Sequence, residues 1–250
     1  MTAKRIRYET SAEYFSKIPG CPIAYRATPV IFSAYKNAQT LEKVCSPKQG
    51  LITGNVNQFV RKWHECSIIN TYLFTNQSKA NSNYRWFPYC NGGEYRKWYG
   101  NNDDVVNWYN DGSEVKNFTD DNGKQRSRPQ NQQFYFCEGG TWTAISSGSF
   151  SIRYFPKGYL FSNAGMAIFV SHEKLLYIIG FLNSPLSQLF LHTLNESLNY
   201  NQGDIARLPI VDAGEMQSSV NSKVEKLIST SKEEWDSFET SWDFKKHPLI

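Results

Sequence analysis

The sequence predicts a mixed α/β fold, in which a twisted β-sheet is followed by a helical unit. Between residues 50 and 170, short aromatic or apolar stretches alternate with turn-forming Gly, Asn and Asp, as in strands joined by tight turns. From Glu173 onward, apolar residues recur every three or four positions, as on one face of a helix. With 250 residues, 40% of them hydrophobic and 20% charged, the chain can bury a sizeable core.

Three segments are expected along the chain. Residues 1–16 show no apolar period and are expected to lead in from a missing upstream region. Residues 17–172 are expected to form the sheet domain, and residues 173–250 a helical C-terminal unit that is truncated. Within the first domain, two prolines favour an extended backbone over 18–25, whereas apolar residues at helical spacing predict a helix over 29–44.

The remaining elements follow from the same two patterns. Aromatic and β-branched residues concentrate in four predicted strands, at 142–146, 150–154, 159–161 and 165–170. Turns are predicted where Asn, Asp and Gly cluster, including 110–112 and 121–123. Two helical segments separated near 183–185 and a helix over 215–229 are expected to follow, and then an acidic aromatic tail.

Several classes of protein are disfavoured by composition. The five cysteines are odd in number, widely spaced and without C-x-x-C, which argues against a disulfide framework or a zinc knuckle. The longest apolar run has eight residues, far fewer than the roughly 20 of a membrane span. No secretory h-region follows Met1. The sequence therefore predicts a cytoplasmic protein without a membrane partner.

Charge is distributed unevenly along the chain. Residues 1–100 contain 14 Lys and Arg against 5 Asp and Glu, whereas the remaining residues contain 13 against 18. A polyanion such as nucleic acid would be attracted to the first hundred residues. A basic solvated surface that binds nothing is the alternative interpretation.

Motifs for catalysis are largely missing. The sequence has no G-x-G-x-x-G, no G-x-x-x-x-G-K-[ST], no H-E-x-x-H and no G-x-S-x-G, and its four histidines are too dispersed for a local metal site. One weak pattern, Asp103 or Asp104 with Glu114 and Lys116, resembles the acidic residue and E-x-K of magnesium-dependent nucleases. A polar turn around 110–112 is the favoured interpretation of these residues, so no catalytic or metal-binding residue is assigned.

Two stretches have the composition of a nucleic-acid surface. Cations and aromatic rings alternate over 85–100, and both types are used to bind phosphates and stack on bases. Residues 124–133 are rich in Arg, Gln and Asn, whose side chains match base edges in the major groove. An aromatic core beneath a basic rim, and an ordinary polar loop, are the alternatives.

These stretches also carry a resemblance to a known family. The motifs K-I-P-G at 17–20, G-L-I-T-G-N at 50–55, W-F-P-Y at 86–89, G-G-E-Y-R-K-W-Y-G at 92–100 and L-N-S at 182–184 span nearly the whole chain. Together they resemble the target-recognition region of PglX-type adenine-specific DNA methyltransferases of BREX phage-defence systems, which are related to type IIG restriction-modification enzymes. The long aromatic block is specific to this group.

The resemblance implies a function and a set of partners. The chain would be the DNA-binding, target-recognition portion of an N6-adenine methyltransferase, acting on double-stranded DNA beside an upstream methyltransferase domain and possible partner proteins of the defence complex. The parent enzyme would use S-adenosylmethionine, but the chain has no N-P-P-Y motif, so it is expected to bind no cofactor and to be inactive alone. A nuclease-like domain or a protein-docking domain remains the alternative.

The candidate DNA contacts are cations and amide or hydroxyl side chains within the matched motifs. They are Lys48, Thr53, Asn55, Asn57, Arg61, Lys62, Arg96, Lys97, Arg126, Arg128 and Gln130. Arg126, Arg128 and Gln130 are expected to read bases, whereas Arg61 and Lys62 are expected to hold the DNA backbone.

Overall fold

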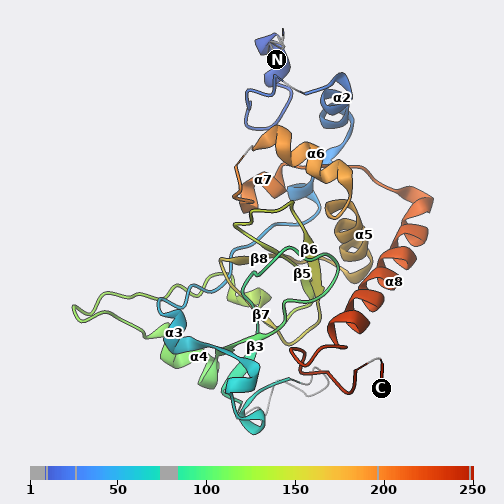
Figure 1. Ribbon diagram of the computed structural model, residues 1–250. Coiled ribbons are helices and arrows are strands. Elements are labelled where there is room, and N and C mark those ends of the chain that lie inside the picture. The colour runs from blue at the N-terminus through green and yellow to red at the C-terminus, as the bar shows by residue number, and fades with distance from the viewer. Residues whose placement is uncertain (1–8, 10, 26, 74–83, 196, 248) are drawn as a thin grey trace, which may run out of the picture.

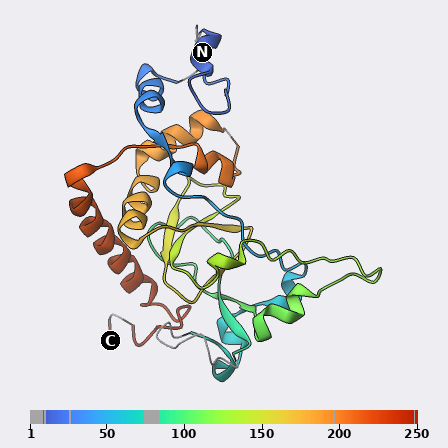
Figure 2. The ribbon, with the colours of Figure 1, turned by 180° about the vertical axis from the view of Figure 1, so that it is seen from behind.

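The structure is a computed structural model that describes residues 9, 11–25, 27–73, 84–195, 197–247 and 249–250. It confirms the mixed α/β class: several small sheets occupy the middle of the chain and the three longest helices follow the two larger sheets (Figure 1). Seen from behind, the same arrangement leaves a long hairpin projecting from the side opposite the last helix (Figure 2).

The helices and strands alternate irregularly along the chain. The helices are α1 (Ala12–Phe15), α2 (Pro29–Asn37), α3 (Val56–Phe59), α4 (Tyr109–Lys116), α5 (His172–Leu182), α6 (Pro185–Leu194), α7 (Gln202–Ala206) and α8 (Gln217–Trp235). The strands are β1 (Gln39–Thr40), β2 (Val60–Lys62), β3 (Trp86–Cys90), β4 (Asp104–Asn107), β5 (Gly139–Thr143), β6 (Ile152–Phe155), β7 (Leu160–Phe161), β8 (Gly165–Ile168) and β9 (Pro209–Ile210).

The strands form three sheets rather than one. A four-stranded mixed sheet has the order β2-β4-β3-β7, a three-stranded antiparallel sheet the order β6-β5-β8, and β1 pairs with β9. Residues 48–52 join the two larger sheets, because Lys48 pairs with Ala167 of β8 and Leu51 bridges to Ser162, just after β7. The sheet region expected between residues 50 and 170 is therefore present, but it is divided.

Two hydrophobic clusters support these sheets. The first packs the three-stranded sheet, including Trp142 and Ile152, against α5 and α8, and its members extend from Ile18 to Val224. The second packs aromatic and apolar residues of the four-stranded sheet, such as Tyr89 and Phe161. The division of the chain at residue 173 remains a prediction, and the first cluster draws residues from both sides of it.

The helical segments agree with the apolar period. The break between α5 and α6 lies at 183–185, where Asn183 bonds the backbone N–H and carbonyl of Ile152 at 3.0 and 2.9 Å and Ser184 caps α6. Among the described residues no single helix is long and apolar enough to cross a bilayer; only α5 with α6, bent by 72° at their break, reach that length and composition together.

One local expectation needs correction, and one open alternative is decided by the structure. The helix predicted over 29–44 ends at Asn37, because the chain then extends so that Gln39 can pair with Ile210 of β9. For residues 86–90 the sequence leaves a nucleic-acid surface and an aromatic core both open; these residues form β3, with Phe87, Tyr89 and Cys90 buried. The aromatic half of that stretch is therefore core.

One charged side chain is buried between the sheets. Arg153 of β6 is 1% exposed, and its Nη2 donates to the Gly92 carbonyl at 3.3 Å and lies 3.5 Å from the Thr143 hydroxyl. Its Nε and Nη1 have no hydrogen-bond partner among the described residues. Burial lowers the pKa of the Arg153 guanidinium from 12.5 to about 10. A buried cation without a counter-ion costs stability.

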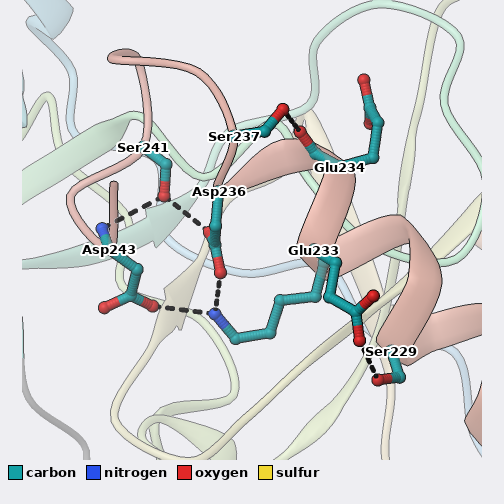
Figure 3. Close-up of polar contacts among 8 residues, drawn as sticks. Ser229, Glu233, Glu234, Asp236, Ser237, Ser241 and Asp243 are labelled. Atoms are coloured by element: carbon teal, nitrogen blue, oxygen red, sulfur yellow. Dashed lines mark hydrogen bonds and ion pairs between the residues drawn. The ribbon is translucent and has the colours of Figure 1, made fainter. Parts of the chain in front are cut away.

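The segment after α8 is held by a polar network around the end of that helix (Figure 3). Lys232 donates to Asp243 at 2.9 Å and also to Asp236, and Ser241 donates to Asp236 at 2.7 Å. The ammonium of Lys232 also lies 5.2 Å from the ring centroid of Tyr99. The network therefore joins the acidic tail to the loop before β4.

Lys232→Met should lower the free energy of unfolding by about 1 kcal/mol at neutral pH, because partly exposed ion pairs contribute little more than this. Burial alone lowers the pKa of Lys232, but hydrogen bonds to the two aspartates raise it above 10.5, so the stabilisation is complete below pH 10.5. Urea unfolding at low and high ionic strength measures the effect. Lys226→Met, on an exposed position of the same helix, is the control, and equal losses in both variants would contradict a role for the network.

Candidate nucleic-acid interface

Two candidate segments that are distant in sequence lie side by side in the structure. Ile52 and Arg128 exchange backbone hydrogen bonds of 3.0 and 2.7 Å, the Gln130 amide donates to the Gly50 carbonyl at 3.4 Å, and the Asn131 amide donates to the Gln49 carbonyl at 2.9 Å. We call residues 48–57 with residues 118–131 the hairpin face. It brings together the candidates Lys48, Thr53, Asn55, Asn57, Arg126, Arg128 and Gln130.

The T-G-N sequence at 53–55 has a local structural reason. Gly54 has a φ of +77°, and a Cβ there would lie 2.7 Å from the backbone carbonyl carbon of Arg126. Glycine therefore allows residues 53–55 to pass directly against the second segment. Asn55 then caps α3, its side chain accepting from the Gln58 N–H at 3.2 Å. Sequence reasoning found these residues, but not that Asn55 is used as a cap.

The candidates of the hairpin face differ in exposure. Thr53 is only 4% exposed and lines a pocket of about 240 Å³ with Asn91 and Asn163. Arg126 and Arg128 are exposed, and neither guanidinium has an ion pair or side-chain hydrogen bond with any of the described residues. These two cations are therefore available to a phosphate or a base.

Arg61 and Lys62 lie on β2, directly after α3, and the Arg61 guanidinium donates to the Asn57 carbonyl of the hairpin face. The Arg61 guanidinium lies 5.9 Å from the Trp86 ring centroid and donates to the Val60 carbonyl at 2.7 Å. Lys62 forms ion pairs with Asp103 at 2.6 Å and Asp104 at 2.8 Å. Burial lowers the pKa of Lys62, but its hydrogen bonds to the two aspartates outweigh burial and leave the pKa raised. Lys62 is thus already neutralised.

Arg96 and Lys97 have partners in the helical unit. Arg96 pairs with Glu234, and its guanidinium lies 5.0 Å from the Trp235 ring centroid. Lys97 donates to the Asn183 carbonyl at 2.8 Å, at the break between α5 and α6. In both ribbon views α8, which carries the Arg96 partner Glu234, lies on the side opposite the projecting hairpin (Figures 1 and 2).

The residues of the nuclease-like pattern are bound separately. Asp104 accepts from Asn91 and pairs with Lys62, whereas Glu114 pairs with Arg85 at 2.9 Å. Lys116 pairs with Asp111 at 2.7 Å. No group of three or more His, Cys, Asp or Glu suited to a metal occurs in the part of the chain that the structure describes. The pattern is not assembled into one site.

Sequence comparison identifies relatives of this chain, although no family model matches it. It is 39% identical over 250 residues to the adenine-specific methyltransferase PglX of Lacticaseibacillus casei (strain Zhang), a match that covers 97% of this chain and 20% of the relative. It is 37% identical over 240 residues to the adenine-specific methyltransferase BrxX of Escherichia coli O9:H4 (strain HS), covering 94% of this chain and 18% of the relative.

The chain therefore spans about a fifth of the length of the curated relatives that it matches. At this identity, and over nearly the whole chain, the resemblance to PglX-type adenine-specific methyltransferases is confirmed. The chain is a homologue of part of the PglX-type adenine-specific methyltransferases.

Proposed function

We propose that this chain is the DNA-binding, target-recognition portion of an adenine-specific methyltransferase of a phage-defence system. The observation that carries the proposal is the hairpin face, which joins two candidate segments and presents the unpaired cations Arg126 and Arg128. Cations that lack internal partners can neutralise phosphates and release counter-ions, which is the main source of affinity for DNA. The names of the relatives support adenine as the base that is modified.

Methyl transfer is assigned to a part of the protein that this chain does not include. The sequence contains neither a glycine-rich cofactor loop nor an N-P-P-Y motif, so we assign no residue to S-adenosylmethionine. A neighbouring methyltransferase domain would bind that cofactor and take the adenine out of the base stack. The proposed partners are thus double-stranded DNA, this domain and possible proteins of the same defence complex. With DNA as its substrate, and with all five cysteines free, the chain is assigned to the cytoplasm.

Fluorescence anisotropy tests the proposal. It measures how tightly the 250-residue chain binds mixed-sequence duplex DNA at several salt concentrations. With about four phosphate contacts, log K should fall against log salt with a slope of about −3.6, and Arg126→Ala or Arg128→Ala should each reduce the slope by about 0.9. Lys226→Ala removes the same charge from α8, on the opposite side, and should leave the slope unchanged. Undetectable binding, or a slope near zero, would favour the protein-docking alternative.

A further inference from the structure

A β-hairpin is the most prominent projection of the molecule. It runs from Phe118 to Ser127 and extends away from the sheets in both ribbon views (Figures 1 and 2). Thr119 and Gln125 pair across it, and the Arg126 N–H donates to the Phe118 carbonyl at 3.0 Å. Residues 121–124 form its tip, and all four are exposed.

The hairpin is ordered by its own hydrogen bonds. The Asp120 carboxylate accepts from the N–H groups of Asn122 at 3.1 Å and Lys124 at 2.9 Å. The Asp120 N–H donates to the Lys124 carbonyl at 2.9 Å, and Gly123 takes the φ of +75° that the turn requires. The side chain of Asp120 is therefore used internally, whereas those of Asp121, Asn122 and Lys124 form no ion pair or side-chain hydrogen bond with the described residues.

The base of the hairpin is anchored to α3 and α4. The Phe118 ring packs edge-on against Phe59 with centroids 5.2 Å apart, and the Gln125 amide donates to the Lys116 carbonyl at 2.7 Å. Arg128 pairs with Ile52 just beyond the end of the hairpin. This pairing fixes the direction in which the hairpin projects. Such preorganisation keeps the entropy lost on binding small.

The dimensions and chemistry of this element match one groove of DNA. The major groove, about 12 Å wide, admits a two-stranded β-ribbon, whereas the minor groove is only about 6 Å wide. Asn can bond adenine through two atoms, Lys can bond guanine, and a carboxylate can accept from the amino group of cytosine. Asp121 would be repelled by phosphates, so a carboxylate at the tip suits contact with base edges better than contact with the backbone.

We infer that the hairpin 118–127 enters the major groove and that Asn122 and Lys124 at its tip determine the recognised sequence. Asn122 would contact adenine and Lys124 would contact guanine. Arg126 and Arg128, which their side-chain types predict to read bases, would instead hold phosphates near the base of the hairpin. The inference rests on the proposed function and deepens it. It also adds two residues that sequence reasoning did not select, although the D-N-G turn at 121–123 flanked by polar residues signals such a hairpin.

Selection of binding sites from randomised duplexes by the 250-residue chain tests the assignment. The wild type should select a short motif, and Asn122→Ala and Lys124→Ala should each lose the preference at one position, about 5- to 150-fold. Lys226→Ala, with the same charge change on α8, should select the wild-type motif. If neither tip variant changed the selected motif, or if the wild type bound DNA without selecting a motif, the inference would be overturned but the proposed function would stand. If the wild type did not bind DNA at all, both the inference and the proposed function would be overturned.

Chemical interference gives a readout of the groove that is independent of selection. Methylation of guanine N7 blocks the major groove, whereas methylation of adenine N3 blocks the minor groove. Within the selected site, N7-methylguanine should weaken binding of the wild type but have little effect on Lys124→Ala. Interference confined to adenine N3 would place the hairpin outside the major groove and overturn the assignment.

Discussion

Gly50→Ala should destabilise the protein by at least about 3 kcal/mol, because the atoms around Gly50 cannot move aside to make room for a Cβ. A Cβ on Gly50 would overlap the carbonyl oxygen of Phe161 and would lie 2.7 Å from a ring carbon of the same residue. The Phe161 carbonyl also accepts from the Leu51 N–H at 2.8 Å, so the backbone cannot retreat without losing this bond. Urea unfolding monitored by tryptophan fluorescence measures the loss.

Gly203→Ala provides a matched control in the same assay. Gly203 lies in α7, and nothing lies within 4 Å of the position that its Cβ would take. Alanine in a helix is favoured over glycine, so this variant should gain about 0.5–1 kcal/mol. Similar stabilities for Gly50→Ala and the wild type would mean that residues 48–52 do not join the two sheets as described.

Arg153→Met should raise the free energy of unfolding by about 1–3 kcal/mol, because it removes a buried charge that has no counter-ion and replaces it with an apolar side chain of similar length. Part of the gain is offset by losing the 3.3 Å hydrogen bond to the Gly92 carbonyl. Arg153→Lys keeps the charge but concentrates it on one atom, so this variant should be less stable than the wild type.

The pH dependence of the difference has a definite sign. Burial lowers the pKa of Arg153 to about 10 from 12.5, so the folded state holds fewer protons than the unfolded state above pH 10. The wild type should therefore gain stability relative to Arg153→Met as the pH rises above 10, and the advantage of the methionine variant should narrow. If Arg153→Met instead loses stability at pH 7, the guanidinium contributes more through its hydrogen bonds than burial costs.

The helical elements could be predicted because their signal is local. The apolar period located α5 and α6 within a few residues, and the proline after Ser184 marked the break between them. It also located the start of α8, but this helix continues to Trp235, six residues beyond the predicted end at 229. Strands β2, β3 and β4 have only three to five residues, and β3 and β4 are largely buried on both faces, so these two lack the alternation that identifies a strand. The internal Pro88 of β3 also disfavours a strand in this segment. The proline is the last residue of β3 that pairs with β4, and the following residues of β3 pair with β7.

The candidate site was predictable only in part, for a related reason. Side-chain type singled out Arg126 and Arg128, which are unpaired and exposed, but it also singled out Arg96 and Lys97. Arg96 is bound by Glu234, 138 residues away, and Lys97 by Asn183, 86 residues away. No local sequence pattern predicts these two partners. Whether a cation is free or internally bound depends on tertiary contacts that residue type does not report.

The contacts of residues 240–242 determine when the core of the four-stranded sheet can be fully covered during synthesis. The indole N–H of Trp63 donates to the Thr240 carbonyl at 2.9 Å across 177 residues, and Trp242 packs on the second hydrophobic cluster with its ring 6.1 Å from that of Tyr159. Because translation is vectorial, the four-stranded sheet must leave the ribosome with part of its apolar surface uncovered until residues 240–242 follow. Contacts of such high sequence separation also slow folding, so chaperone binding is expected at this surface of the nascent chain.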